Sequence, residues 1–158
     1  MKRQKQEDLP FQAKFYARVE AEALFYGVHV PAPDAAATHE TDWHATVQWL
    51  GKPENDAWLK KQSLAHELGI RDLDQKGFRG ELTLQDDVWV HTGSATKDAP
   101  VESLSAFLST ALESGSVNLR IEKRIAKDAA VEKKKGIAGD IAALFESMMP
   151  MYAAAVEG

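Results

Sequence analysis

Alternation of apolar and polar residues is the feature of this 158-residue chain that most constrains its fold. The first alternating segment places five apolar residues at every second position: Phe15, Ala17, Val19, Ala21 and Ala23. Successive side chains of a strand point to opposite faces, so this pattern predicts a long strand over residues 14–30 with one face in water. A helix remains the alternative for this segment, because Ala and Glu are good helix formers.

Further segments fit a mainly β domain. Residues 43–50 and 116–124 alternate in the same way, and residues 77–91 offer two short strands around a polar turn. Helices are expected over 55–68 and 101–114, because each segment has an N-terminal capping residue and a glycine directly after it. The apolar segment 137–152 fits either a helix or a strand. Together these elements are typical of a small β-barrel with one or two helices.

Composition indicates one globular domain and excludes several classes of protein. Apolar residues make up 44% of the chain and charged residues 27%, as in ordinary globular domains. The absence of cysteine excludes disulfides, thiolate zinc sites and cysteine nucleophiles. No apolar run approaches the roughly 20 residues of a membrane helix, and no secretory signal is recognised, so we expect a cytoplasmic protein without membrane contact. The expected organisation is a flexible N-terminal arm (1–12), one domain (13–153) and a short C-terminal tail (154–158).

Charge is unevenly distributed along the chain. The formal net charge is -5, but residues 120–135 hold seven cations against three anions and therefore carry +4. The seven cations are Arg120, Lys123, Arg124, Lys127, Lys133, Lys134 and Lys135. A local basic strip can attract a polyanion even on an acidic protein, because distant charges are screened beyond about 8–10 Å. The alternative is a solvated connection between two elements.

One short motif suggests catalysis. His44-Ala45-Thr46, followed by Leu50-Gly51, resembles the first half of the two-histidine phosphoesterase signature, in which two His-x-Thr strands supply a base and an acid. The second copy is missing, and His44 and Thr46 can equally occupy the wet face of a strand. His39, Asp42 and His44 are too loosely spaced for a metal site. We therefore expect no metal, no cofactor and no enzymatic activity.

A second resemblance covers residues 14–152. The segment Gly115–Arg120 looks like the "GS-x-V-x-V" strand of phage single-stranded DNA-binding proteins of the T7-like type, and Lys135–Leu144 resembles the "KG-(V/I)-x-A-x-L-x-A" element that follows it. The resemblance implies a five-stranded OB barrel with one or two helical insertions. It also implies sequence-independent binding of single-stranded DNA during phage replication or recombination, with replication proteins and a homo-oligomer as further partners. It does not extend to an acidic tail, since residues 153–158 hold one acid.

Single-strand binding of this kind needs cations along a groove and aromatic faces for the bases. The expected DNA-binding residues are Tyr16, Arg18, Trp89, His91, Arg120, Lys123, Arg124, Lys127, Lys133, Lys134 and Lys135. Trp89 is the expected stacking platform, because the alternation predicts that its neighbours Val88 and Val90 point toward the core and that Trp89 points outward. Two other functions remain open: a phosphodiesterase built on His44 and Thr46, and a phage assembly protein whose basic strip meets a partner.

Overall fold

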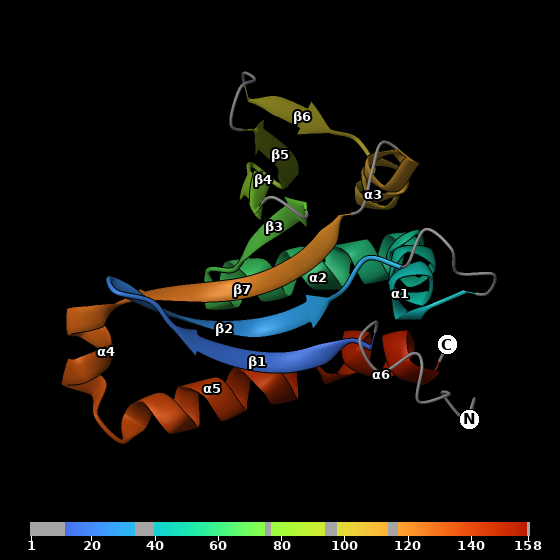
Figure 1. The fold of residues 1–158 in the computed structure, drawn as a ribbon. Coiled ribbons are helices and arrows are strands. Elements are labelled where there is room, and N and C mark those ends of the chain that lie inside the picture. Colours follow the sequence, from blue (N-terminus) through green and yellow to red (C-terminus); the bar gives the residue numbers. More distant parts are fainter. Residues whose placement is uncertain (1–11, 34–39, 75–76, 94–97, 114–116, 158) are drawn as a thin grey trace.

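The computed structural model describes residues 12–33, 40–74, 77–93, 98–113 and 117–157 (Figure 1). Seven strands and six helices lie in these residues. In chain order they are β1 (Lys14–Val19), β2 (Ala23–Val30), α1 (Asp42–Leu50), α2 (Pro53–His66), β3 (Gly69–Asp74), β4 (Gly77–Gln85), β5 (Val88–Gly93), β6 (Ala99–Val101), α3 (Leu104–Glu113), β7 (Asn118–Ala126), α4 (Lys127–Lys133), α5 (Gly136–Ser147) and α6 (Met149–Glu157). Helix α6 thus includes residues 154–157, which were expected to form a tail.

The strands form one antiparallel sheet in the order β1-β2-β7-β3-β4-β5-β6. Strand β7, late in the chain, lies between β2 and β3 and brings together residues that are far apart in sequence. One row of paired residues crosses six strands: Phe15, Val28, Ile121, Ile70, Leu82 and His91. Because residues that pair directly share a face, this row defines one side of the sheet.

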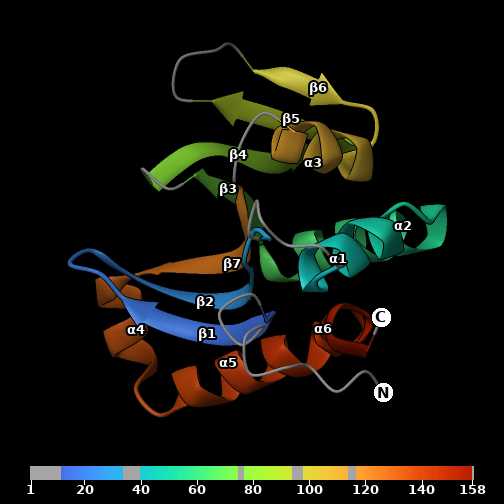
Figure 2. The ribbon, with the colours of Figure 1, turned by 45° about the vertical axis from the view of Figure 1, so that its right-hand side comes forward.

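Helices pack on the side of the sheet that this row defines. The Phe15 ring stacks on Phe145 of α5 and on Tyr152 of α6, with ring centroids 4.7 Å apart in each case. The His91 ring contacts Phe107 of α3, with ring centroids 4.7 Å apart. Helix α3 lies beside β5 and β6 (Figures 1 and 2). The buried members of the row, Val28, Ile70, Leu82 and Ile121, are at most 1% exposed and form the centre of the core. The opposite face of β1, β2, β7 and β3 carries the candidate site.

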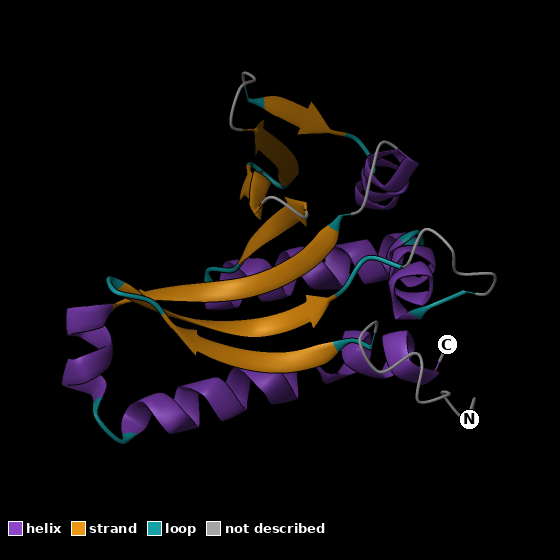
Figure 3. Ribbon diagram, in the orientation of Figure 1, coloured by secondary structure: helices purple, strands orange, loops and turns teal. Residues whose placement is uncertain are grey.

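The expected five-stranded OB barrel is wrong. The sheet has seven strands, and β1 and β6 are its edges within the described residues, so it is open and the fold is mixed α/β. Residues 43–50, expected as a strand, form α1, and residues 136–157 are helical in α5 and α6 (Figure 3). The reason in α1 is that Trp43, Val47 and Leu50 are buried together, and their spacing of four and three residues follows the period of a helix.

Other expectations at the level of elements are confirmed. The segment 14–30 is extended, although it folds back at residues 20–22 into the hairpin of β1 and β2 rather than forming one long strand. The two short strands of 77–91 are β4 and β5, and the strand of 116–124 is β7. The two expected helices are α2 and α3.

Candidate functional site

The uncovered face of β1, β2, β7 and β3 gathers four arginines from three strands. Arg120 of β7 pairs with Arg71 of β3, and Arg18 and Arg124 both pair with Phe25 of β2. Between these rows lies a third one, which contains Tyr16, Gly27, Glu122 and Gly69. We call this surface the arginine face and define it by Tyr16, Arg18, Phe25, His29, Arg71, Arg120, Glu122 and Arg124.

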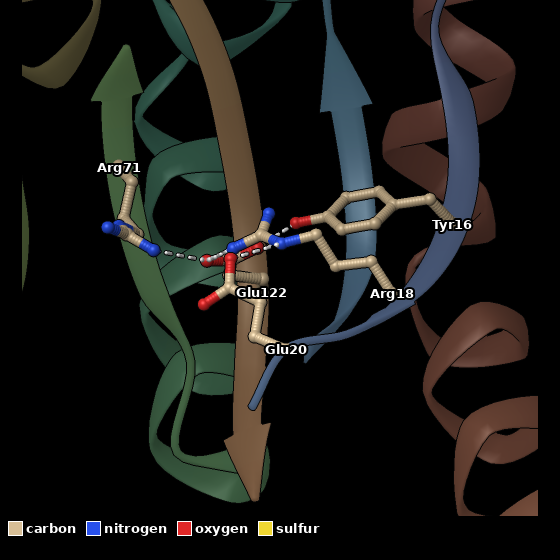
Figure 4. Close-up of polar contacts among 5 residues, drawn as sticks. All are labelled: Tyr16, Arg18, Glu20, Arg71 and Glu122. Atoms are coloured by element: carbon tan, nitrogen blue, oxygen red, sulfur yellow. Dashed lines mark hydrogen bonds and ion pairs between the residues drawn. The ribbon is translucent and has the colours of Figure 1, made fainter. Parts of the chain in front are cut away.

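Glu122 is the buried centre of the arginine face, with 3% of its surface exposed. Its carboxylate accepts hydrogen bonds from the Tyr16 hydroxyl and from Arg71 Nη1, the latter at 3.2 Å, and lies 3.6 Å from Arg18 Nη2 (Figure 4). Burial and the Glu122 carboxylate raise the pKa of Tyr16, so this hydroxyl keeps its proton and remains a donor. One carboxylate thus holds side chains from β1 and β3 together across β7.

Two glycines make room for this arrangement. Gly27 and Gly69 pair with Glu122 from its two sides. A Cβ at Gly27 would collide with the Ile121 carbonyl oxygen and would lie 2.7 Å from Glu122 Cα. A Cβ at Gly69 would lie 2.5 Å from Glu81 Oε1. A glycine inside a strand commonly marks such a close approach of neighbouring groups. Gly27 lies between Tyr16 and Glu122 in the sheet, so its missing side chain allows Tyr16 to reach Glu122 across β2.

Aromatic rings support the guanidinium groups. The Arg18 guanidinium lies 4.4 Å from the centroid of the Phe25 ring, and that of Arg71 lies 5.8 Å from the same ring. The Arg120 guanidinium lies 5.5 Å from the Tyr16 ring centroid. Cation–π contacts of this kind fix the planes of the guanidinium groups and leave their N–H edges for other partners.

Several polar atoms of this face lack a partner. Arg18 Nη1, Arg120 Nε and His29 Nε2 are buried and make no hydrogen bond with the residues that the structure describes. Burial, together with the positive charges of Arg120, Lys14 and Arg18, lowers the pKa of His29 to about 4, so His29 is neutral at pH 7. Buried polar groups are nearly always satisfied, so these three atoms mark this face as a polar region that the described protein groups do not fully satisfy.

A pocket of about 360 Å³ opens at one end of the arginine face. Its lining combines four carboxylates, two guanidinium groups, one aromatic ring and a glycine: Glu20, Phe25, Glu67, Gly69, Arg71, Glu81, Glu122 and Arg124. Most of its charged groups are already paired with one another or with neighbours. Arg71 contacts Glu122 and Glu20 contacts Arg18, whereas Glu67 lies 3.8 Å from Lys123 Nζ.

The structure brings together only four of the residues expected to bind DNA, namely Tyr16, Arg18, Arg120 and Arg124. Trp89 is 2% exposed, and its indole Nε1 donates a hydrogen bond to Asp56 Oδ1 at 3.0 Å, so the expected exposed platform is wrong. The reason is that Trp89, and not its valine neighbours, points toward the helices, where Asp56 of α2 satisfies the indole N–H. His91 and Lys123 also lie on the helix-covered side; Lys123 Nζ donates to the His66 carbonyl oxygen at 3.1 Å.

The remaining expected cations lie at the α4–α5 corner of the molecule (Figure 1). We call Lys127, Lys133, Lys134 and Lys135 the lysine segment. All four are exposed, and Lys133 Nζ makes an ion pair of 2.8 Å with Asp140. The segment is therefore a solvated group of cations and does not continue the arginine face.

Sequence reasoning missed Phe25, His29, Arg71 and Glu122. Arg71 was overlooked because no strand was expected between the helix of residues 55–68 and residue 77, whereas residues 69–74 form β3 at the centre of the sheet. The available signal was Gly27 within the alternating segment, because an isolated glycine in a strand pattern indicates a close approach by another group.

His44 and Thr46 have structural roles in α1. His44 Nδ1 accepts a hydrogen bond from the Thr41 backbone N–H at 3.1 Å at the start of the helix, and the buried Thr46 hydroxyl donates to the Asp42 carbonyl oxygen at 2.7 Å. The His-x-Thr strand that a phosphoesterase needs is therefore replaced by a helix. No group of three or more His, Asp or Glu side chains in the described residues could hold a metal ion, and His39 lies outside them.

Across the described parts of the chain, none of the helices combines the length and the apolar character needed to cross a membrane. Comparison with known proteins finds no matching family model, no matching curated protein and no matching solved structure. The arginine face and its pocket are thus the features on which a functional assignment rests.

Proposed function

We propose that the arginine face binds single-stranded DNA, mainly through its phosphates. The observation that carries this proposal is that four at least partly exposed arginines gather on one sheet face, where the buried Glu122 carboxylate contacts only two of them, Arg18 and Arg71. Phosphate oxygens are the acceptors that guanidinium groups match best, because both groups allow paired, charge-assisted hydrogen bonds. The negative net charge of the chain does not oppose such binding, since screening limits the interaction to nearby charges.

The shape of the site favours a single strand over a duplex. An open sheet face presents side chains from several strands side by side, and unpaired bases can lie flat against guanidinium planes and aromatic rings. Tyr16 and the guanidinium groups above Phe25 offer such planes here. In a duplex the bases are stacked inside, so only the phosphates would meet this surface.

The experiment is a fluorescence titration of labelled oligo-dT at several salt concentrations. Arg120→Ala/Arg124→Ala removes two cations of the face and spares Arg18 and Arg71, which hold Glu122. Each lost phosphate contact should reduce the magnitude of the slope of log affinity against log salt by about 0.7. The slope of the double variant should therefore be smaller by about 1.4, and the variant should bind more weakly.

The matched control is Lys134→Ala/Lys135→Ala, which removes the same charge from the lysine segment. This variant should keep the wild-type slope to within about 0.3, less than half of one phosphate contact. Equal slopes and affinities for wild type and the arginine variant would overturn the proposal, as would duplex of equal length binding as tightly as oligo-dT. Circular dichroism melting of each variant verifies that it is folded.

A further inference from the structure

We propose that the pocket at the end of the arginine face holds one guanine base of the bound strand, read by Glu81 and Arg124. This inference rests on the proposed function and adds a base preference at one nucleotide to binding that otherwise follows the phosphates. The pocket volume of about 360 Å³ lies at the lower end of the range for small-molecule sites, about 300–1,000 Å³, and suits one base and its sugar.

Glu81 and Arg124 are the two charged residues of the pocket lining whose side chains have no polar partner among the described residues. Both line it, yet neither side chain makes a hydrogen bond or an ion pair with the residues that the structure describes. The other charged groups of the lining have partners, as described above for Glu20, Glu67, Arg71 and Glu122. An unpaired carboxylate and an unpaired guanidinium in one pocket fit a ligand that offers donors to one and acceptors to the other.

Backbone geometry holds these two groups apart. The backbone of Glu81 on β4 lies directly opposite that of Arg71 on β3. Arg124 lies on β7, directly opposite Phe25 of β2. Gly69 lies between them on β3, and a Cβ there would come within 2.5 Å of Glu81 Oε1. The missing side chain at residue 69 thus leaves the Glu81 carboxylate free to lie along the pocket wall.

Guanine is the base that uses both groups fully. Its N1–H and N2–H₂ groups are adjacent donors, which an ionised carboxylate accepts with its two oxygens. Its O6 and N7 atoms are adjacent acceptors, which arginine binds in the commonest specific contact between proteins and DNA. Thymine offers one ring N–H, and adenine and cytosine offer one amino group each, so none of them gives a carboxylate two adjacent donor groups.

The test compares oligo-dT with strands of equal length that carry one central dG or one central dI. The expected result is that the dG strand binds wild type about 5- to 150-fold tighter than oligo-dT, the range for one good bidentate contact. Deoxyinosine lacks the 2-amino group and should lie between the two. Glu81→Gln should lose most of the preference for dG, measured as the ratio of the affinities for the dG strand and for oligo-dT, because an amide has a single acceptor oxygen.

The matched control is Glu67→Gln, which changes an exposed carboxylate of the same pocket that already faces Lys123. It should retain the preference for dG. If oligo-dT binds but the dG strand binds no tighter, the guanine pocket is wrong and the proposed function stands. If Glu81→Gln keeps the full preference, the reading of the base by Glu81 is wrong. If no strand binds wild type, the proposed function fails and the guanine pocket with it.

Discussion

The arginine face and the lysine segment carry charge of the same sign but differ in how the chain holds it. Arg18 and Arg71 have about a quarter of their side chains exposed (24% and 25%), lie on strands and share one buried carboxylate. Lys133 is 47% exposed and pairs with the equally exposed Asp140. Guanidinium groups with fixed planes can recognise a ligand by direction, whereas solvated ammonium groups act as point charges. The comparison teaches that positive charge becomes a site only where the fold fixes its geometry.

The sharpest test of this difference adds one methyl group to a glycine beside each region, Gly27 next to Glu122 and Gly139 next to Asp140. Gly27→Ala places a Cβ against the backbone of β7, which cannot give way without separating β2 from β7, and we expect a loss of at least about 3 kcal/mol in the free energy of unfolding. Gly139→Ala is the control on α5, where nothing lies within 4 Å of the new Cβ. It should gain about 0.5–1 kcal/mol, because alanine favours helix over glycine.

Urea denaturation of the two alanine variants measures both values. An unchanged or increased stability of Gly27→Ala would contradict the close approach of β2 and β7 on which the Tyr16–Glu122 contact depends.

A smaller effect is expected when the acidic partner of each region is neutralised. Glu122→Gln keeps the size of the side chain but removes the charge that Arg18 and Arg71 face in a buried setting, and we expect a loss of about 1–3 kcal/mol. Asp140→Asn removes the partner of Lys133 at the surface and should change stability by no more than about 0.5 kcal/mol. Equal losses in the two variants, measured by urea denaturation, would show that Glu122 is no more than an ordinary surface charge.

The same two regions show how far the sequence alone could lead. The alternating pattern correctly predicted strands for residues 77–91 and 116–124 and extended structure for residues 14–30, because a strand with one wet face leaves a local signal. The single long strand expected over residues 14–30 is instead the hairpin of β1 and β2. The charge count correctly located a basic stretch, but the fold divides that stretch. Arg120 and Arg124 face the site, Lys123 faces the helices, and the lysines lie on or after α4.

The remainder could not be predicted because it depends on pairing between distant strands. Arg71 joins the site only because β7 enters the sheet between β2 and β3, and nothing local to residues 69–74 specifies that neighbour. Residues 43–50 carry both a period of two and a helical spacing of Trp43, Val47 and Leu50. The helix is the form observed, because it lets α1 pack on α6 and on the rest of the core. The prediction for Trp89 was shifted by one residue along the strand. It put Val88 and Val90 on the buried face, whereas Trp89 lies there.

The smallest expected effect concerns His29, the neutral histidine among the arginines. Its folded-state pKa of about 4 lies below the ordinary value of 6.5, so between these values the unfolded chain binds a proton that the folded chain does not. The stabilisation is therefore fully present above about pH 6.5 and is lost as the pH falls toward 4. His29→Gln cannot take up this proton and should show a weaker decrease in stability between pH 7 and pH 5, measured by urea denaturation at each pH. Lys134→Gln in the lysine segment leaves His29 in place and should keep the wild-type pH dependence. If His29→Gln and wild type lose stability in parallel, the arginines around His29 do not suppress its protonation, and the arginine face is as well solvated as the lysine segment.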